Sequence, residues 1–466
     1  MARITDDGIH EECGVFAICA PGIDVAQLAY LGLFALQHRG QEGCGLAVWN
    51  EGKIRFHKRL GLVNDVFNED ILAGLPGSLA IGHVRYATTG ETSELNTQPI
   101  VANYYQGQFA LAHNGNLTNT EKLRESLAKT GSLFQTTTDT EVLCNLLARY
   151  AESSMDVAMH KAMLDLEGSY ALVAVNDGKI FAARDPYGNR PLCIGALPNG
   201  AGYVVASESC ALDTVGADFV RDVEAGEIIV IDEDGVHSVA TQKAGKTAHC
   251  IFEYVYFARP DSTIDGINVN QSRRRMGAIL ARETGDLGVD IVIPVPDSGT
   301  TAAIGYAEAS GKPFTQGILK NRYTARSFIQ PTQAMRERMV NLKLSPIREE
   351  IGGKKVAVVD DSIVRGTTSR RLVALLRERG AAEVHMLITC PPVLYPCYYG
   401  IDTAERDKLI AANKSIEEIR EYIGADSLHY LSLEGLYEAV GGTDDYCVAC
   451  LNGDYCLGHP ACKKSK

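Results

Sequence analysis

Two adjacent carboxylates end an apolar run in the second half of the chain. Residues 356–359 read Val-Ala-Val-Val, and Asp360 and Asp361 follow directly. Behind them come a cation, a glycine and three hydroxyl residues, namely Arg365, Gly366, Thr367, Thr368 and Ser369. A helix beginning here would offer unpaired N–H groups and its positive dipole end to a phosphate, whereas the carboxylates suit sugar hydroxyls, Mg²⁺ or both. The alternative is a helix N-cap with incidental acids; the missing GxxxxGK[ST] spacing disfavours an ordinary ATPase.

A possible nucleophile, Cys13, stands at the head of an apolar run near the start of the chain. Taken alone, such a cysteine is more often a core residue. Three polar segments make a catalytic role for Cys13 more plausible than a core role, because each lies between strand-like stretches where a pocket could form. They are GHVRYATTG at 82–90, AHNGNL at 112–117 and TDTE at 138–141. Their individual structural explanations are a surface ion pair, a tight turn and a helix N-cap.

Four cysteines crowd the C-terminal end of the chain: Cys447, Cys450, Cys456 and Cys462. The first two form a CVAC unit, which fits zinc, a redox dithiol or an iron–sulfur ligand pair. The chain holds 13 cysteines in all, an odd number that excludes complete disulfide pairing. Zinc bound by these four cysteines is one hypothesis, and an iron–sulfur site is the other.

Composition limits the class of protein. A chain of 466 residues is long enough for two or three domains. The net charge of −13 argues against a nucleic-acid binder. No apolar run approaches the roughly 20 residues that span a membrane, and residues 1–12 lack the apolar core of a signal peptide. We therefore expect a cytoplasmic protein with no nucleic-acid or membrane partner.

The elements that must position these residues change character along the chain. In the first half, strand-like runs such as 13–20, 109–113, 170–175 and 227–232 alternate with helical runs such as 120–129. A polar stretch at 241–247 predicts a boundary.

Beyond it, strands at 290–295, 355–359 and 384–388 alternate with helices at 302–310 and 370–378. This alternation predicts an open, mostly parallel α/β sheet with ligands beyond its carboxyl ends. Residues 320–346 are expected to form a long loop.

The run at 356–369 resembles the phosphoribosyl pyrophosphate signature of type I phosphoribosyltransferases. The resemblance implies that Asp360 and Asp361 bind the ribose hydroxyls and Mg²⁺. It assigns the 5′-phosphate to Arg365, Gly366, Thr367, Thr368 and Ser369. It also places Ser298 near Mg²⁺, and Lys320 and Arg322 at the pyrophosphate. It further implies a fold with helices on both faces of the sheet.

Cys13 and the three polar segments together resemble the class II glutamine amidotransferases, which have the αββα sandwich of the N-terminal nucleophile hydrolases. The resemblance implies that residues 1–12 are a propeptide removed at the bond before Cys13. The freed α-amine, with a pKa of roughly 8, could then act as base for its own thiol. The implied glutamine contacts are Arg85 for the α-carboxylate, Asp139 for the α-ammonium, Gly90 in the pocket wall, and Asn114 and the Gly115 N–H as oxyanion hole.

Both halves together, with cysteines at HCIFEYVYF and YPCYYGID, resemble the iron–sulfur subgroup of glutamine phosphoribosylpyrophosphate amidotransferases. The ligands implied for a [4Fe–4S] cluster are Cys250, Cys397, Cys447 and Cys450. The implied domains are 13–245 for glutamine hydrolysis and 246–466 for phosphoribosyl transfer. The implied reaction converts glutamine, phosphoribosyl pyrophosphate and water to 5-phosphoribosylamine, glutamate and pyrophosphate, at the start of purine synthesis. A homotetramer inhibited by purine nucleotides is also implied.

Two alternatives stay open from the residues. Another class II amidotransferase, for example one with a sugar-phosphate isomerase domain, would share Cys13 and Arg85 but not the run at 356–369. A non-catalytic regulator could keep that run as a sensor, but it would not need an intact glutamine pocket.

Overall fold

The computed structural model describes residues 13–86, 93–321, 344–401, 403 and 405–458. Three predicted site residues, Gly90, Arg322 and Cys462, lie outside these ranges, as do residues 1–12 and most of the expected 320–346 loop. Within the described ranges, no helix combines the length and apolar character needed to cross a membrane.

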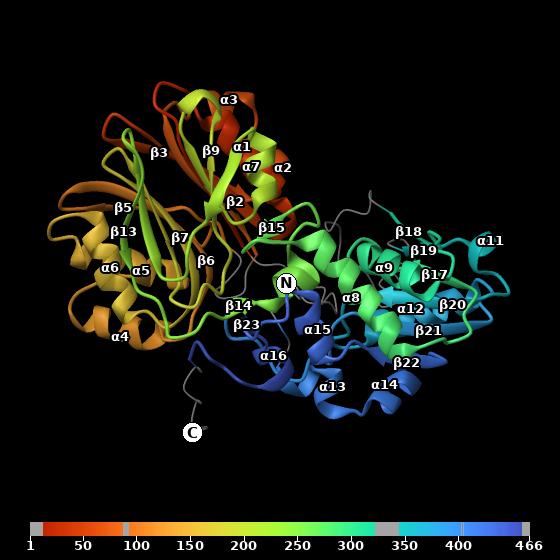
Figure 1. The fold of residues 1–466 in the computed structure, drawn as a ribbon. Helices are drawn as coiled ribbons and strands as arrows, with labels where there is room; N and C mark the ends of the chain where they lie inside the picture. The colour runs from red at the N-terminus through yellow and green to blue at the C-terminus, as the bar shows by residue number, and fades with distance from the viewer. Residues whose placement is uncertain (1–12, 87–92, 322–343, 402, 404, 459–466) are drawn as a thin grey trace.

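Two antiparallel sheets form the centre of the first half (Figure 1). The seven-stranded sheet has the order β11-β9-β10-β1-β4-β2-β3, and the six-stranded sheet has the order β13-β12-β8-β7-β6-β5. The first contains β1 (Gly14–Cys19), β2 (Gly43–Asn50), β3 (Lys53–Leu60), β4 (Leu79–Arg85), β9 (Cys193–Ala196), β10 (Tyr203–Ala206) and β11 (Asp218–Asp222). The second contains β5 (Ile100–Tyr104), β6 (Gly107–Leu117), β7 (Gly168–Asn176), β8 (Lys179–Arg184), β12 (Glu227–Asp232) and β13 (Gly235–Thr241).

Helices cover the outer face of each sheet, which completes four layers. Side chains alternate along a strand, so Val15 and Ala17 of β1 pack between the sheets, while Phe16 and Ile18 face the helices. The helices on the first sheet are α1 (Ala26–Ala35), α2 (Val63–Val66), α3 (Glu69–Ala73) and α7 (Ser209–Val215). Those on the second are α4 (Thr120–Lys129), α5 (Asp139–Tyr150) and α6 (Met155–Asp165). The predicted αββα sandwich is confirmed.

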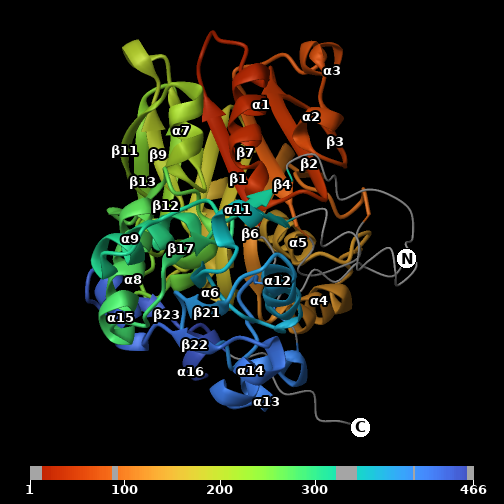
Figure 2. The same cartoon turned by 90° about the vertical axis from the view of Figure 1, so that its right-hand side faces the viewer.

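A parallel sheet organises the second half, in the order β17-β20-β21-β22. Its strands are β17 (Ile291–Pro294), β20 (Lys355–Asp360), β21 (Glu383–Ile388) and β22 (Ser427–Tyr430). One face packs on α8 (Val269–Thr284), α9 (Thr300–Ser310) and α15 (Leu433–Ala439). The other packs on α12 (Thr367–Glu378) and α14 (Ile416–Ile423). The predicted open sheet with helices on both faces is confirmed (Figure 2).

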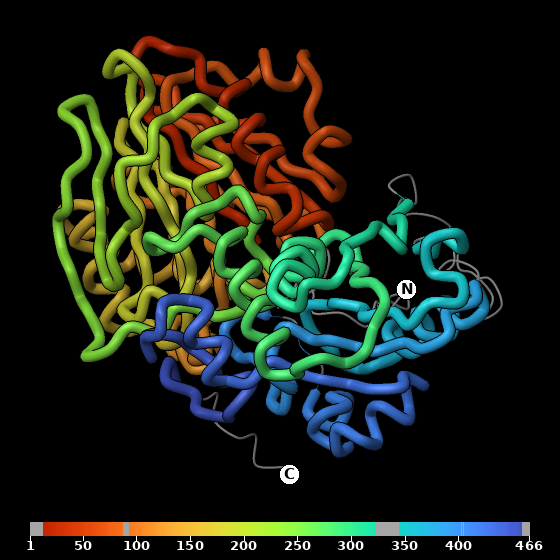
Figure 3. The backbone as a smooth tube through the Cα atoms, turned by 45° about the vertical axis from the view of Figure 1, so that its right-hand side comes forward, coloured from red at the N-terminus to blue at the C-terminus, as the bar shows by residue number. Residues whose placement is uncertain are grey.

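A short parallel pair joins the end of the chain to the middle. β14 (His249–Cys250) pairs with β23 (Tyr446–Cys447), and α16 (Ala449–Asn452) follows. The C-terminal segment therefore folds back beneath the first half (Figure 3). Between β14 and α8 lie the π-helix η3 (Glu253–Phe257) and the strands β15 (Thr263–Ile264) and β16 (Ile267–Asn268).

The predicted element bounds agree with the structure in some places and differ in others. β12 and α4 have the predicted bounds. α12 begins at Thr367, three residues before the predicted start, because Gly366 adopts a left-handed φ of 78° and caps it. The expected 320–346 loop has paired ends, since β18 (Ile318–Lys320) and β19 (Leu344–Pro346) are antiparallel neighbours. The remaining short helices are α11 (Arg348–Ile351) and α13 (Ile410–Asn413).

Candidate active sites and the cysteine cluster

Cys13 directly precedes β1, and its side chain faces the space between the two sheets. It continues the row of Val15 and Ala17, which belong to the core between the sheets. The thiol is half-buried and donates to the backbone carbonyl of Tyr86, at the end of β4, at 3.4 Å. The candidate nucleophile thus lies at the edge of the intersheet core rather than deep inside it.

Asn114 and Gly115 lie near the end of β6, in the opposite sheet. Asn114 continues the row of Ala110 and Ala112, so it also faces the space between the sheets. Its Nδ2 is buried and has no hydrogen-bond partner among the described residues. A buried amide donor without a partner is costly, so this N–H group is available to an oxyanion.

Gly115 has a φ of 137°, and a Cβ there would lie 2.2 Å from the carbonyl oxygen of Ser169 on β7. Only glycine fits this position, because a side chain would push the paired strand away. The strand therefore depends on a glycine beside the candidate oxyanion donor.

Two buried groups of opposite charge lie at the ends of β4 and β6. Arg85 ends β4 and is only 3% exposed, and Asp139 begins α5. Burial raises the pKa of Asp139, but His113 at 3.5 Å and the Leu117 N–H at 3.1 Å outweigh it, so the net shift is downward. Burial and Arg85 lower the pKa of His83 to about 3. A fixed cation and a fixed anion match the two charges of an amino acid.

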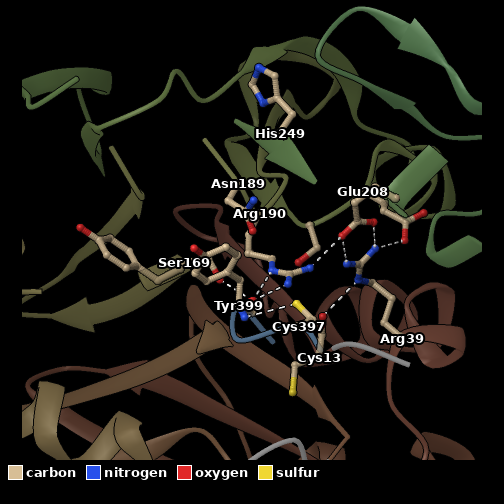
Figure 4. A network of polar contacts seen from close by, with 12 residues as sticks. Cys13, Arg39, Ser169, Asn189, Arg190, Glu208, His249, Cys397 and Tyr399 are labelled. Carbon is tan, nitrogen blue, oxygen red and sulfur yellow. Dashed lines mark hydrogen bonds and ion pairs between the residues drawn. The ribbon is translucent and has the colours of Figure 1, made fainter. Parts of the chain in front are cut away.

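A buried arginine that sequence reasoning missed supports Cys13. Arg39, in the 3-10 turn Gln37–Arg39, donates its Nε–H to the Cys13 carbonyl oxygen at 3.1 Å. Its guanidinium also pairs with Glu208 at 2.5 Å (Figure 4). It pairs with Glu253 at 2.7 Å as well. The neighbouring His38 also contacts Glu208, at 2.7 Å. No sequence signal links these residues, because Glu208 and Glu253 lie in unrelated segments.

The phosphate-type loop lies at the carboxyl end of the parallel sheet. Asp360 ends β20, and Gly366 caps α12 without a side-chain hydrogen bond to its first turn. Thr367 and Thr368 are exposed and Ser369 is buried. The first turn of α12 therefore keeps two exposed hydroxyl residues and lacks a side-chain cap, so its N–H groups could bind an anion.

The two carboxyl groups are buried together. The pKa of Asp360 is raised well above its ordinary value by burial and by Asp361. Burial also raises the pKa of Asp361, opposed by hydrogen bonds from Ser298 and Ser362 and by the charge of Arg273. The pair would favour a cation between or beside them. Sequence reasoning missed Arg273, a buried α8 residue whose guanidinium donates to the carbonyls of Tyr254 and Ala258.

The loop after β17 lies against β20, because a Cβ at Gly299 would approach the Val359 carbonyl oxygen to 2.4 Å. This contact carries Ser298 to Asp361. Lys320, at the end of β18, donates to Asp297 of the same loop at 2.8 Å. The structure thus brings Ser298, Lys320 and the aspartate pair to one edge of the sheet, whereas Arg322 lies outside the described residues.

The four predicted cluster cysteines meet where β14, β23 and α16 come together. Cys250 and Cys447 are paired residues of β14 and β23. Burial raises the pKa of Cys450 well above its ordinary value, and the nearby thiols Cys397, Cys390 and Cys250 raise it further. The Tyr399 N–H donates to Cys397 Sγ at 3.3 Å.

Cys456 is exposed and forms a side-chain hydrogen bond with Cys447, which lowers its pKa. Across the described ranges, no three His, Cys, Asp or Glu side chains converge tightly enough to hold a single metal ion. Cys462, the fourth residue of the zinc hypothesis, lies outside those ranges.

Two family models match the chain. A glutamine amidotransferase domain matches residues 83–214, and a phosphoribosyl transferase domain matches residues 270–418. The first range contains Arg85, Asn114, Gly115 and Asp139 but not Cys13. The second contains Ser298, Lys320 and the run at 356–369.

Curated relatives match over nearly the full length. The amidophosphoribosyltransferase of Synechococcus elongatus is 47% identical over 466 residues, which covers 99% of this chain and 94% of that protein. The Bacillus subtilis amidophosphoribosyltransferase is 48% identical over 454 residues, 96% of this chain and 94% of that protein.

A solved structure agrees in fold. The glutamine phosphoribosylpyrophosphate amidotransferase from B. subtilis, complexed with ADP and GMP, superposes with a TM-score of 0.90 at 47% identity, over 95% of this chain and 97% of that one. The matched lengths include both halves of the molecule and the junction between them. This chain belongs to the amidophosphoribosyltransferase family.

Proposed function

We propose that this enzyme hydrolyses glutamine at Cys13 and passes the ammonia to phosphoribosyl pyrophosphate held by residues 356–369. The products are 5-phosphoribosylamine, glutamate and pyrophosphate, in the first committed step of purine synthesis. The observation that carries the residue assignment is that Cys13 and Asn114 face one intersheet space from opposite sheets. The buried charges of Arg85 at the end of β4 and of Asp139, which accepts from the Leu117 N–H at the end of β6, suit the two charges of free glutamine.

In the glutamine half, the α-amine of Cys13 takes the thiol proton once residues 1–12 have been removed. The thiolate attacks the amide carbon, and the tetrahedral oxyanion is stabilised by Asn114 Nδ2 and the Gly115 N–H. The protonated α-amine then returns its proton to the leaving nitrogen, so that collapse releases ammonia and leaves a thioester. Water hydrolyses the thioester to glutamate and regenerates the Cys13 thiol. Arg85 would hold the α-carboxylate in a forked contact, Asp139 the α-ammonium, and Gly90 would line the pocket.

In the phosphoribosyl half, the α12 N-terminus and its hydroxyl residues would bind the 5′-phosphate. Asp360 and Asp361 would bind the ribose hydroxyls and Mg²⁺, and Ser298 would lie near the same ion. Two buried carboxyls with raised pKa values fit a cation. When bound, Mg²⁺ would neutralise the leaving pyrophosphate. Lys320 and Arg322 would add cationic contacts to that leaving group.

We also propose that Cys250, Cys397, Cys447 and Cys450 hold a [4Fe–4S] cluster. Supporting this proposal, Cys250 and Cys447 are paired residues of β14 and β23, the thiols of Cys397 and Cys250 lie near enough to Cys450 to raise its pKa, and Cys397 accepts an N–H hydrogen bond. When bound, the cluster would crosslink the C-terminal segment to the junction, since the reaction transfers no electrons.

A homotetramer, inhibition by purine nucleotides and a cytoplasmic location complete the proposal. The B. subtilis relative was solved with ADP and GMP, which supports nucleotide binding in this family.

Replacing Cys13 by alanine should separate the two activities. We expect Cys13→Ala to lower glutamine-dependent synthesis by more than about a thousandfold, because the nucleophile is lost. Synthesis from added ammonia should remain, since it needs only the second site. Steady-state release of pyrophosphate with each nitrogen donor measures both. Cys44→Ala, at a buried cysteine of the same sheet, is the control and should keep both activities. If Cys13→Ala loses both activities while the control keeps them, the two-site assignment is contradicted.

Asp360→Asn should weaken substrate binding and yet stabilise the unliganded protein. An Asp whose pKa is raised in the folded state destabilises that state as pH rises through the folded pKa. At pH 8 we therefore expect a higher thermal midpoint, together with an affinity for Mg²⁺ and phosphoribosyl pyrophosphate about 10–100-fold lower. Calorimetry measures both, with exposed Asp286→Asn as control. Unchanged affinity would remove Asp360 from the site.

Cys397→Ser should lower the iron and acid-labile sulfide bound per chain. Cys144→Ala, at a buried cysteine far from the junction, should leave both unchanged. Metal analysis and visible absorbance of protein purified without oxygen measure the difference. Zinc in place of iron in the unmodified protein would contradict the cluster assignment.

A further inference from the structure

The strand with the candidate oxyanion donors is contacted by a segment nearly 300 residues away. Gly400 has a φ of 117°, and a Cβ there would lie 3.3 Å from the carbonyl carbon of Gly115 and 3.4 Å from its Cα. On its other side, Gly115 approaches the backbone of Ser169. The Gly115 peptide is thus held between β7 and the segment that follows Cys397.

Hydrogen bonds fix this contact on both strands. The Asn116 side-chain amide donates to the Tyr398 carbonyl oxygen at 2.8 Å. The Ser169 hydroxyl, on β7, donates to the Tyr399 carbonyl oxygen at 2.5 Å. Asn116 and Ser169 are direct partners in the β6–β7 register. Two carbonyls from the second half therefore hold one pair of opposed residues, one position beyond Gly115.

Tyr398 and Tyr399, whose carbonyl oxygens accept these hydrogen bonds, lie in a segment that is itself held by several contacts. Tyr399 is buried, and its hydroxyl donates to the Gly458 carbonyl at 3.0 Å and accepts from the Leu457 N–H at 3.1 Å. The Arg190 guanidinium donates to the Tyr399 carbonyl and lies 3.7 Å from Glu253.

Glu253 also pairs with Arg39, which binds the Cys13 carbonyl (Figure 4). A continuous series of polar contacts therefore connects the Cys13 backbone with the strand pair that carries Asn114 and Gly115.

We propose that Asn116 and Ser169 are positioning residues for glutamine hydrolysis: they anchor the Asn114–Gly115 strand to the Tyr398 and Tyr399 carbonyls. This inference rests on the proposed oxyanion role of Asn114 and Gly115. Oxyanion donors act only when they are aimed at the position that the oxygen takes in the transition state, and small displacements are costly. The second half of the chain therefore sets the geometry of the first active site.

The test uses Asn116→Ala and Ser169→Ala in the full-length protein with saturating Mg²⁺ and phosphoribosyl pyrophosphate. We expect kcat for glutamine hydrolysis to fall about tenfold to a hundredfold with KM for glutamine unchanged. Synthesis from ammonia should be unchanged. Alkylation of Cys13 by iodoacetamide, followed by peptide mass spectrometry, should keep its rate, because the nucleophile itself is not disturbed.

Asn119→Ala is the matched control. Asn119 is also half-buried and donates its side-chain amide to a carbonyl, that of Asp165, at 2.8 Å, but within the first half of the chain. It should keep the kcat of the unmodified protein. Thermal midpoints of all variants show whether each is folded, and Ser169→Ala tests the same contact from the other strand.

The outcomes separate the inference from the proposed function. If Asn114→Ala still hydrolyses glutamine at the normal rate, the oxyanion assignment is wrong. If Asn114→Ala loses activity while Asn116→Ala and Ser169→Ala keep full kcat, or change only KM or the thermal midpoint, the positioning role alone is overturned. An equal loss in Asn119→Ala would also overturn it.

Discussion

The burial of Arg39 between two carboxylates is the constraint on which much of the molecule depends. A guanidinium that is 1% exposed must be compensated, and Glu208 and Glu253 supply the opposite charges. Burial alone would raise the pKa of Glu208. The contacts with His38 and Arg39 together have the larger effect and lower it, so this carboxylate stays ionised. Removal of Arg39 would leave two buried carboxylates without the cation that they share. The segments around Cys13, Glu208 and Glu253 are therefore fixed to one another.

The two candidate sites use charge in opposite ways. Around the candidate glutamine pocket, His113 and the Leu117 N–H lower the pKa of Asp139. At the parallel sheet, burial raises the pKa values of the neighbouring Asp360 and Asp361, an arrangement that a bound cation would stabilise. The first site suits a zwitterion and the second a metal-bound phosphate. Two adjacent buried carboxyl groups lower the stability of the folded protein. Such a cost is typical of residues that serve ligand binding rather than folding.

The sequence predicts the local structure well and the long-range contacts poorly. Periodicity locates β12 and α4 correctly, and the Asp-Asp run followed by Gly366 marks the phosphate-type loop, because these signals are local. Asn116 and Tyr398 carry no comparable signal: they lie 282 residues apart and use a backbone carbonyl that any residue provides. Arg273 was missed for a related reason, since a buried arginine on an amphipathic helix resembles a surface charge until the fold is known.

The central claim is that Cys13 hydrolyses glutamine with its own α-amine as base. The most direct test is the intact mass of the purified, glutamine-active protein, with its N-terminal residue identified by peptide sequencing. We expect the active chain to begin at Cys13, and a chain that retains residues 1–12 to lack glutamine hydrolysis while still using ammonia. Full glutamine hydrolysis by a chain that still begins at Met1 would contradict the claim.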